Sequence, residues 1–172
     1  MKKRWFVVVG AFIIQISLGA IYIWSVFQTP LLAHFPVWTE RQVTFPAQII
    51  LACFALAVII AGQIQDKVGP RPVAMAGGLM LAAGLMLASL TSHFPPDKAL
   101  SWLIITYSVL GGLGIGTAYV CPLATCVKWF PDKRGLITGL AVAGFGAGAF
   151  FFPPLGKYLI CGVYYKKKKK NL

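Results

Sequence analysis

Charged residues are scarce in this chain, and acidic residues most of all. Its 172 residues include four Asp and Glu together, and charged residues make up only 12% of the total. A soluble domain carries about twice that charged share. Hydrophobic residues reach 58%, and the mean hydropathy is +0.77. The composition therefore excludes an ordinary soluble domain, and we expect an all-α integral membrane protein.

Residues that hold metals or perform catalysis are also few and poorly spaced. No Cys-x-x-Cys occurs, and the histidines lie far from the cysteines in sequence. We expect no metal site, no cofactor, no disulfide framework and no enzyme activity, since no nucleophile–base pattern appears. The residues concerned are Cys53, Cys121, Cys126, Cys161, His34 and His93. The net charge of +12 does not indicate a nucleic-acid partner, because the bases cluster at the ends of apolar runs.

Five apolar runs approach the roughly 20 residues that a helix needs to cross a bilayer. They predict membrane helices over residues 5–28, 45–63, 73–92, 100–127 and 136–155. The basic start of the chain also fits a signal peptide. Because the run to Phe27 is long and no clear cleavage site follows, we interpret it as an uncleaved first helix. Thr39 is a candidate cap for the second helix.

One polar stretch, Gly62–Arg71, separates the second and third apolar runs. Proline disfavours helical geometry in the residue before it, so Gly69-Pro70 predicts a tight turn at a membrane surface. An ordinary charged loop that obeys the positive-inside rule is the alternative to a functional motif in this stretch.

The distribution of bases predicts the orientation of the chain. With the N-terminus inside, the inner loops carry eight bases and the outer loops only Arg41 and Lys98. The eight are Lys2, Lys3, Arg4, Lys67, Arg71, Lys128, Lys133 and Arg134. We therefore expect a multi-pass protein of the cell inner (plasma) membrane with a cytoplasmic N-terminus. A fifth crossing would place Lys157 and residues 166–170 outside, against this rule.

Polar side chains within the apolar runs are candidates for a transport path. Gln15 and Tyr22 share a helical face in the first run. Tyr119 lies on the face of Gly112 and Gly116, which form a small-xxx-small packing pattern. Such residues face protein or a water-filled cavity, and hydrogen bonding between helices is the alternative role.

The pattern Gly-x-x-x-Asp-Lys-x-Gly-x-Arg resembles the loop signature of the major facilitator superfamily. It comprises Gly62, Asp66, Lys67, Gly69 and Arg71. Within that superfamily the chain is similar to the oxalate/formate antiporter family and its monocarboxylate-transporter relatives. The segments that carry this likeness are residues 19–27, 65–71, 128–135 and 144–149.

The resemblance implies a twelve-helix transporter in two halves, of which this chain is an incomplete N-terminal half bundle. We expect residues 1–160 to form that half-domain and 161–172 an irregular polybasic tail. Beyond Leu155 the likeness to the family ends. The tail favours a truncated or frame-shifted end over an anchor to anionic lipid. The bases that pair with substrate would then lie in the missing C-terminal half.

The function implied is that of a transporter fragment for small organic anions, working by alternating access. Gln15, Tyr22 and Tyr119 would line the substrate path, and Asp66 with Arg71 would act at an inner gate. Asp132 and Arg134 mark the second cytoplasmic loop. The expected partners are membrane lipids, a carboxylate and the missing half. The alternative is a small membrane protein that binds a partner chain or anionic lipid without transport. Substrate, coupling ion and oligomeric state do not follow from the sequence.

Overall fold

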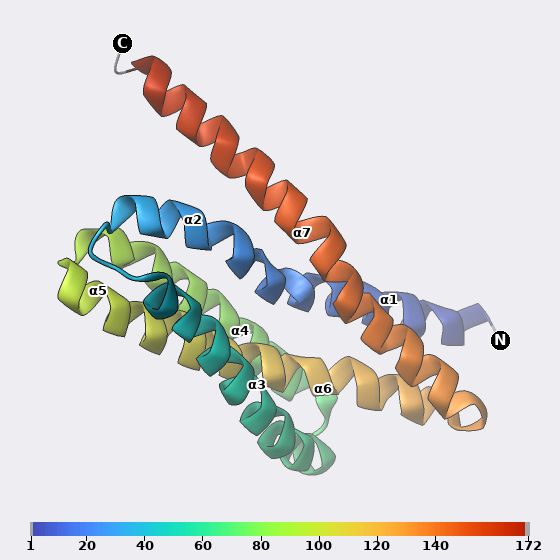
Figure 1. Ribbon diagram of the computed structural model, residues 1–172. Coiled ribbons are helices and arrows are strands. Elements are labelled where there is room, and N and C mark those ends of the chain that lie inside the picture. The colour runs from blue at the N-terminus through green and yellow to red at the C-terminus, as the bar shows by residue number, and fades with distance from the viewer. Residues whose placement is uncertain (1, 171–172) are drawn as a thin grey trace.

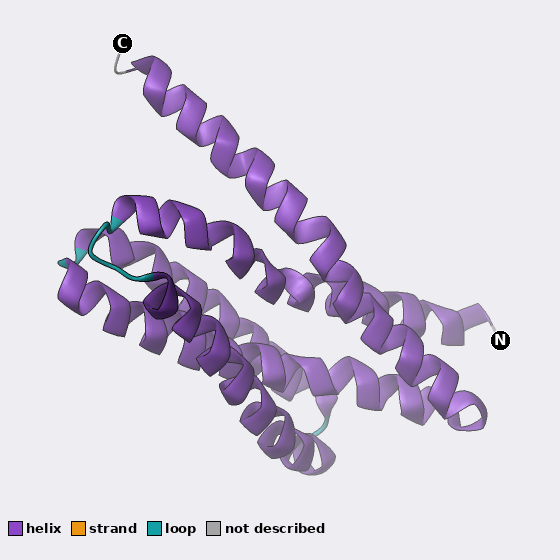
Figure 2. Ribbon diagram, viewed as in Figure 1, coloured by secondary structure: helices purple, strands orange, loops and turns teal. Residues whose placement is uncertain are grey.

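The computed structural model describes the backbone of residues 2–170 and the side chains of residues 4–158. Over that range the chain is helical and contains no strand, which confirms the all-α membrane fold (Figures 1 and 2). Five continuous helices are long and apolar enough to cross a membrane. They are Arg4–His34, Glu40–Val68, Pro70–His93, Pro96–Trp129 and Pro131–Tyr158.

The first crossing consists of α1 (Lys2–Leu18), a 3₁₀ segment η1 (Gly19–Ile23) and α2 (Trp24–His34). It ends six residues later than residue 28, where the apolar run suggested an end. A proline within a helix removes one backbone hydrogen bond. The helix nevertheless continues through Pro30 to the C-terminal end of α2.

The second crossing, α3 (Glu40–Val68), begins five residues before the expected start at residue 45. Thr39 caps it, as expected: its hydroxyl accepts from the Gln42 N–H at 3.4 Å. The Gln42 side-chain oxygen accepts from the Thr39 N–H at 2.9 Å. This capping box satisfies two N–H groups at the helix start, so the helix extends into polar sequence that the apolar pattern left out.

The third and fourth crossings also contain irregular turns. The third is α4 (Pro70–Ser89) followed by the 3₁₀ segment η2 (Leu90–His93). The fourth comprises α5 (Pro96–Leu103), a π-helical segment η3 (Ile104–Gly111) and α6 (Gly112–Trp129). Ser108 in η3 donates to the Pro46 carbonyl of α3 at 2.8 Å, so the wide turn is joined to a neighbouring helix.

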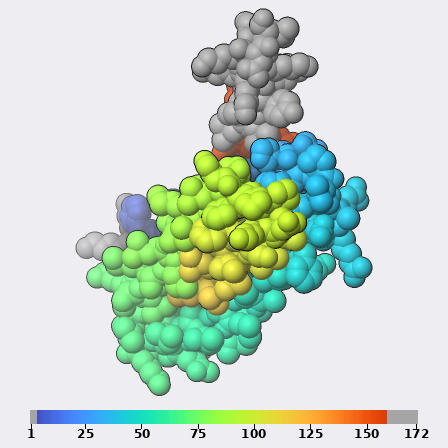
Figure 3. Space-filling view, turned by 90° about the vertical axis from the view of Figure 1, so that its left-hand side faces the viewer, coloured from blue at the N-terminus to red at the C-terminus, as the bar shows by residue number. Residues whose placement is uncertain are grey.

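The fourth crossing lies at the centre of the bundle, because 56% of its most apolar window is buried against 17–33% for the other four. It packs against α3, α4 and α1. Figure 3 shows α5, at one end of this crossing, between α2 and α4. Large apolar side chains on the outer helices are exposed, as lipid-facing positions require; they include Phe6, Met75, Leu79 and Phe150.

The last crossing follows a short 3₁₀ turn, η4 (Pro131–Lys133), and forms one helix, α7 (Arg134–Lys170). It crosses α1 and η1 and then diverges from the other helices (Figure 1). The helix passes Pro153 and Pro154 and the expected end at residue 155. The sequence becomes less apolar after residue 155. The helix continues because its backbone hydrogen bonds do not require apolar side chains. The side chains of the polybasic tail lie outside the described residues.

Candidate functional site

Four aromatic side chains from four crossings meet beside the centre of the bundle. They are Tyr22 in η1, Phe54 in α3, Tyr119 in α6 and Phe145 in α7, and we call them the aromatic cluster. The ring of Phe145 lies 5.6 Å from that of Tyr22 and 5.2 Å from that of Tyr119. The ring of Phe54 lies 5.3 Å from that of Tyr119. Such spacings suit edge-to-face attraction, so the cluster connects all four crossings.

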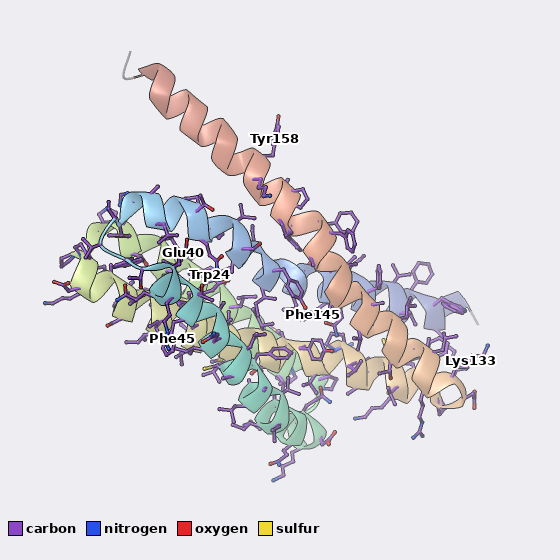
Figure 4. All side chains as sticks on the ribbon, viewed as in Figure 1. Trp24, Glu40, Phe45, Lys133, Phe145 and Tyr158 are labelled. Atoms are coloured by element: carbon purple, nitrogen blue, oxygen red, sulfur yellow. The ribbon has the colours of Figure 1, made fainter. Side chains whose placement is uncertain are left out.

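Figure 4 shows Phe145 where α7 crosses the first helix, and its ring contacts those of the other three members. Tyr158, about three and a half turns further on, projects away from the bundle on the part of α7 that has diverged from the other helices. Tyr22 remains 40% exposed despite its contact with Phe145. The cluster therefore presents a tyrosine at its open edge.

Gln15 lies under this cluster and is fully buried. Its side-chain Nε2 donates to the Tyr119 main-chain carbonyl at 3.3 Å, which joins α1 to α6. Its Oε1 has no hydrogen-bond partner among the described residues. The structure thus brings Gln15 and Tyr119 together, and Phe145 links Tyr22 to Tyr119. The hydrogen bond from Gln15 to the Tyr119 carbonyl fits the role of joining two helices. The Oε1 of Gln15 remains available to accept another hydrogen bond.

Glycine at the crossing of η1 and α7 is what lets these side chains meet. A Cβ added to Gly19 would lie 2.6 Å from the Phe145 carbonyl oxygen, and one added to Gly148 would lie 2.6 Å from the Gly19 Cα. Both distances are far below contact, so neither position accepts a larger residue while the backbones stay in place.

A second pair of glycines brings α6 against α3. Cβ atoms added to Gly112 and Gly116 would lie 2.8 Å from the Ile50 and 2.6 Å from the Phe54 carbonyl oxygens. The small-xxx-small face is therefore a packing face, as the sequence predicts. Tyr119 follows on the same side of α6 and so reaches the ring of Phe54.

The polar stretch between the second and third crossings is mostly helical, and its turn is a single residue. Gly69 has φ +95°, a conformation that favours glycine, and Pro70 opens α4 directly after it. Asp66 and Arg71 are exposed on either side of this turn, and no ion pair engages them among the described side chains. A Cβ at Gly62 would meet nothing within 4 Å, so none of the other helices, as far as the structure describes them, approaches closely there.

The other charged residues of this turn and of the turn before α7 are exposed at the same end of the bundle. Lys67 lies in the last turn of α3, while Asp132 and Arg134 flank the start of α7. Nearby, the Arg4 guanidinium lies 5.3 Å from the centre of the Phe130 ring. We call this end, with Arg4, Lys67, Arg71, Lys128, Lys133 and Arg134, the basic end.

Two buried polar features were not found by sequence reasoning. Gln65 is 2% exposed, and its Oε1 has no partner among the described residues. Gln65 lies four residues after Ala61, which is also buried, so helical periodicity could have placed Gln65 on the buried face of α3. Trp24 stacks on Tyr107 with ring centres 4.8 Å apart, and neither polar group is paired within the described part. No sequence pattern indicates that pairing, since the two residues lie in different crossings.

Within the described residues, no three His, Cys, Asp or Glu side chains gather in a way that could hold a metal ion.

Comparison with known proteins places this arrangement in a family. The model of the Major Facilitator Superfamily matches residues 4–165, beyond Leu155, where the likeness was expected to end. An uncharacterized MFS-type transporter, YhjX, of Escherichia coli (strain K12) is 34% identical over 151 residues, which is 88% of this chain and 36% of that protein.

The names of two further relatives state what they transport. The oxalate:formate antiporter of Oxalobacter formigenes is 31% identical over 163 residues, 90% of this chain and 35% of the antiporter. Monocarboxylate transporter 13 of Rattus norvegicus is 32% identical over 157 residues, 91% of this chain and 35% of the transporter. The chain spans about a third of the length of these relatives.

Proposed function

Because the chain belongs to the major facilitator superfamily, we propose that its five helices form the N-terminal part of a secondary transporter for small organic anions. The observation that carries this proposal is the likeness to the oxalate:formate antiporter and to monocarboxylate transporter 13, each over about nine-tenths of this chain. The proposed substrates are small carboxylates of that kind, moved by alternating access. The proposal assigns no catalytic residue, which fits a family of transporters.

The aromatic cluster is the proposed wall of the substrate path. It joins four crossings, and Tyr22 at its exposed edge offers a hydroxyl that can donate to a carboxylate. Tyr119 would contribute from α6, and Gln15 would hold Tyr119 in place through the hydrogen bond to its carbonyl. The Oε1 of Gln15 has no partner among the described residues, and in the path it would accept a hydrogen bond from water, because an ionised carboxylate has no hydrogen to donate.

The single-residue turn at the basic end is the proposed gate. Gly62, Asp66, Lys67, Gly69 and Arg71 lie around it, and their charged members are exposed. The open space over Gly62 leaves room for a helix of another half to approach. Asp132 and Arg134 at the next inner turn would take part from the same end.

We expect Asp66→Asn to lower carboxylate transport at least about tenfold, because the change removes a charge that the gate needs in one of its states. The variant belongs in a full-length relative with the same Gly-x-x-x-Asp-Lys-x-Gly-x-Arg pattern, assayed by uptake of labelled oxalate or formate. Asp97→Asn, an exposed acid at the opposite end, is the matched control. Unchanged uptake in the Asp66 variant, with normal membrane insertion, would show that the turn is only a charged loop.

The proposed location is the plasma or inner membrane with the basic end in the cytoplasm. The five crossings make the chain a multi-pass membrane protein, and bases concentrate at one end of them. This distribution follows the positive-inside rule.

A cysteine at Lys67 tests this orientation, because that side chain is exposed whereas neighbouring Gln65 is buried and would resist labelling in either orientation. With the native cysteines replaced, Lys67→Cys should resist an impermeant thiol reagent on intact cells and react in inverted vesicles. Val37→Cys, 75% exposed between α2 and α3, should show the reverse pattern. Rapid labelling of the Lys67 position in intact cells would reverse the proposed topology.

A further inference from the structure

Two aromatic side chains outside the aromatic cluster are stacked between the first and fourth crossings. Trp24 is the first residue of α2 (Figure 4) and Tyr107 lies in η3, and their ring planes are 28° apart. They are only 5% and 7% exposed. Both belong to an apolar core that also contains Leu18, Ile21 and Leu103. The pair therefore lies inside the bundle and is not part of a surface that a further helix would cover.

Each of these two rings carries one hydrogen-bond donor. The indole Nε1–H of Trp24 and the hydroxyl of Tyr107 are enclosed, and neither has a partner among the described residues. A buried donor without an acceptor is destabilising, and native proteins rarely retain one. Trp38 shows the usual arrangement, because its Nε1–H donates to the Pro96 carbonyl at 3.2 Å. The stack therefore indicates an acceptor that no described residue supplies.

The depth of the stack limits what this acceptor is. Trp24 lies ten residues before the end of its crossing at His34, and Tyr107 lies eleven residues after the start of its crossing at Pro96. At 1.5 Å per residue this is about 15 Å, half of the roughly 30 Å hydrocarbon thickness. Every Lys and Arg with a described side chain lies near the end of a crossing, so an anion at this depth would be unpaired and costly. The acceptor is therefore neutral and small, which fits water.

The backbone beside both rings is irregular and can accept the hydrogens of a water. Trp24 follows the 3₁₀ segment η1, and its N–H bonds to the Ile21 carbonyl three residues back. Tyr107 lies in the π-helical η3, where hydrogen bonds reach five residues back. Ordered waters accompany such local changes of bonding in membrane helices. Each backbone carbonyl also has a second lone pair, so the two segments offer acceptors to a water between them.

We infer that one ordered water molecule is bound beside this stack. It accepts hydrogen bonds from the Trp24 Nε1–H and the Tyr107 hydroxyl, and it donates to backbone carbonyls of η1 and η3. The water joins the first crossing to the fourth where both helices depart from α geometry. The site does not rest on transport, because neither residue belongs to the aromatic cluster or to the basic end.

Tyr107→Phe tests the site, because it removes the hydroxyl and keeps the stacked ring. We expect the ratio of folded to unfolded chain in mixed micelles to fall about fivefold, the usual effect of losing one hydrogen bond. Tyr158→Phe, 79% exposed on α7, is the matched control and should leave the ratio unchanged. In a Trp24→Phe background the effect of Tyr107→Phe should be smaller, because the water has already lost one donor. An unchanged or raised ratio in Tyr107→Phe, or an equal fall in both backgrounds, would overturn the shared site.

Contact with water can also be observed directly, in chain labelled with ¹⁵N-tryptophan and reconstituted in lipid bilayers. In water-edited solid-state NMR, the Trp24 indole N–H should receive magnetisation from water as readily as that of Trp5, which is 54% exposed. The Trp24 signal is assigned by its loss in Trp24→Phe. Tyr107→Phe should weaken the transfer to Trp24 and leave the transfer to Trp5 unchanged. Absence of transfer to Trp24 in the parent chain would show a dry stack and refute the proposal.

Discussion

Replacing Gly148 by leucine should unfold the crossing of α7 with the first helix. A Cβ there would lie 2.6 Å from the Gly19 Cα and 3.0 Å from the Ile16 carbonyl oxygen. Both atoms are backbone, so relief requires the two helices to separate. We expect a loss of about 3 kcal/mol or more in the free energy of unfolding, the upper end of the range for overpacked positions.

Gly146→Leu is the matched control, because it lies in the same helix and a Cβ there would meet nothing within 4 Å. Its effect should stay within about 0.5 kcal/mol. The measurement is denaturation in mixed micelles, followed by tryptophan fluorescence. Equal losses in the two variants would mean that leucine disturbs α7 itself and that the Gly19–Gly148 contact does not hold the crossing.

The Gly148→Leu variant should also disturb the aromatic cluster. Phe145 comes from the same turn of α7 as Gly148, and its ring contacts those of Tyr22 and Tyr119. Separating the helices removes these contacts together. Packing of two glycines therefore sets the geometry of the proposed substrate path.

The sequence predicts the five crossings because membrane helices depend on apolar length, which is a local property. It also predicts the packing face of Gly112 and Gly116 and the cap at Thr39, since both rest on short spacings within one segment. Where a helix ends in polar sequence, the apolar run is shorter than the helix. The first crossing therefore extends to His34 and the second begins at Glu40, beyond the limits of their apolar runs.

The irregular turns could not be predicted in the same way. The π-helical segment includes Ser108, which bonds to the Pro46 carbonyl of another crossing, and Tyr107, which stacks on Trp24. Each depends on which helices become neighbours. The partner of Gln15 is a main-chain carbonyl of α6, and every residue has one, so no residue type marks it.

The chain alone should insert in a membrane but carry no carboxylate. All nine basic residues with described side chains lie near the ends of the crossings: Arg4, Arg41, Lys67, Arg71, Lys98, Lys128, Lys133, Arg134 and Lys157. A carboxylate at mid-membrane depth would therefore find hydroxyls and amides from this chain but no cation. An unpaired charge there costs several kcal/mol, which is enough to abolish measurable binding.

A transporter of the proposed kind needs that cation from elsewhere, and the chain covers only about a third of its relatives. The open edge of the aromatic cluster, with Tyr22 40% exposed, is where a second half would meet this one. Left open in lipid, such an edge should favour self-association or rapid turnover of the isolated chain, because lipid cannot satisfy its polar groups.

Reconstitution tests the central claim most directly. Purified chain in liposomes loaded with unlabelled oxalate is exposed to radiolabelled oxalate or formate, with the Oxalobacter formigenes antiporter as the active control. Protease protection of the basic end confirms insertion. We expect uptake equal to that of protein-free liposomes, at every substrate concentration. Saturable exchange by this chain alone would contradict the account, because it would show a complete carboxylate path within these five helices.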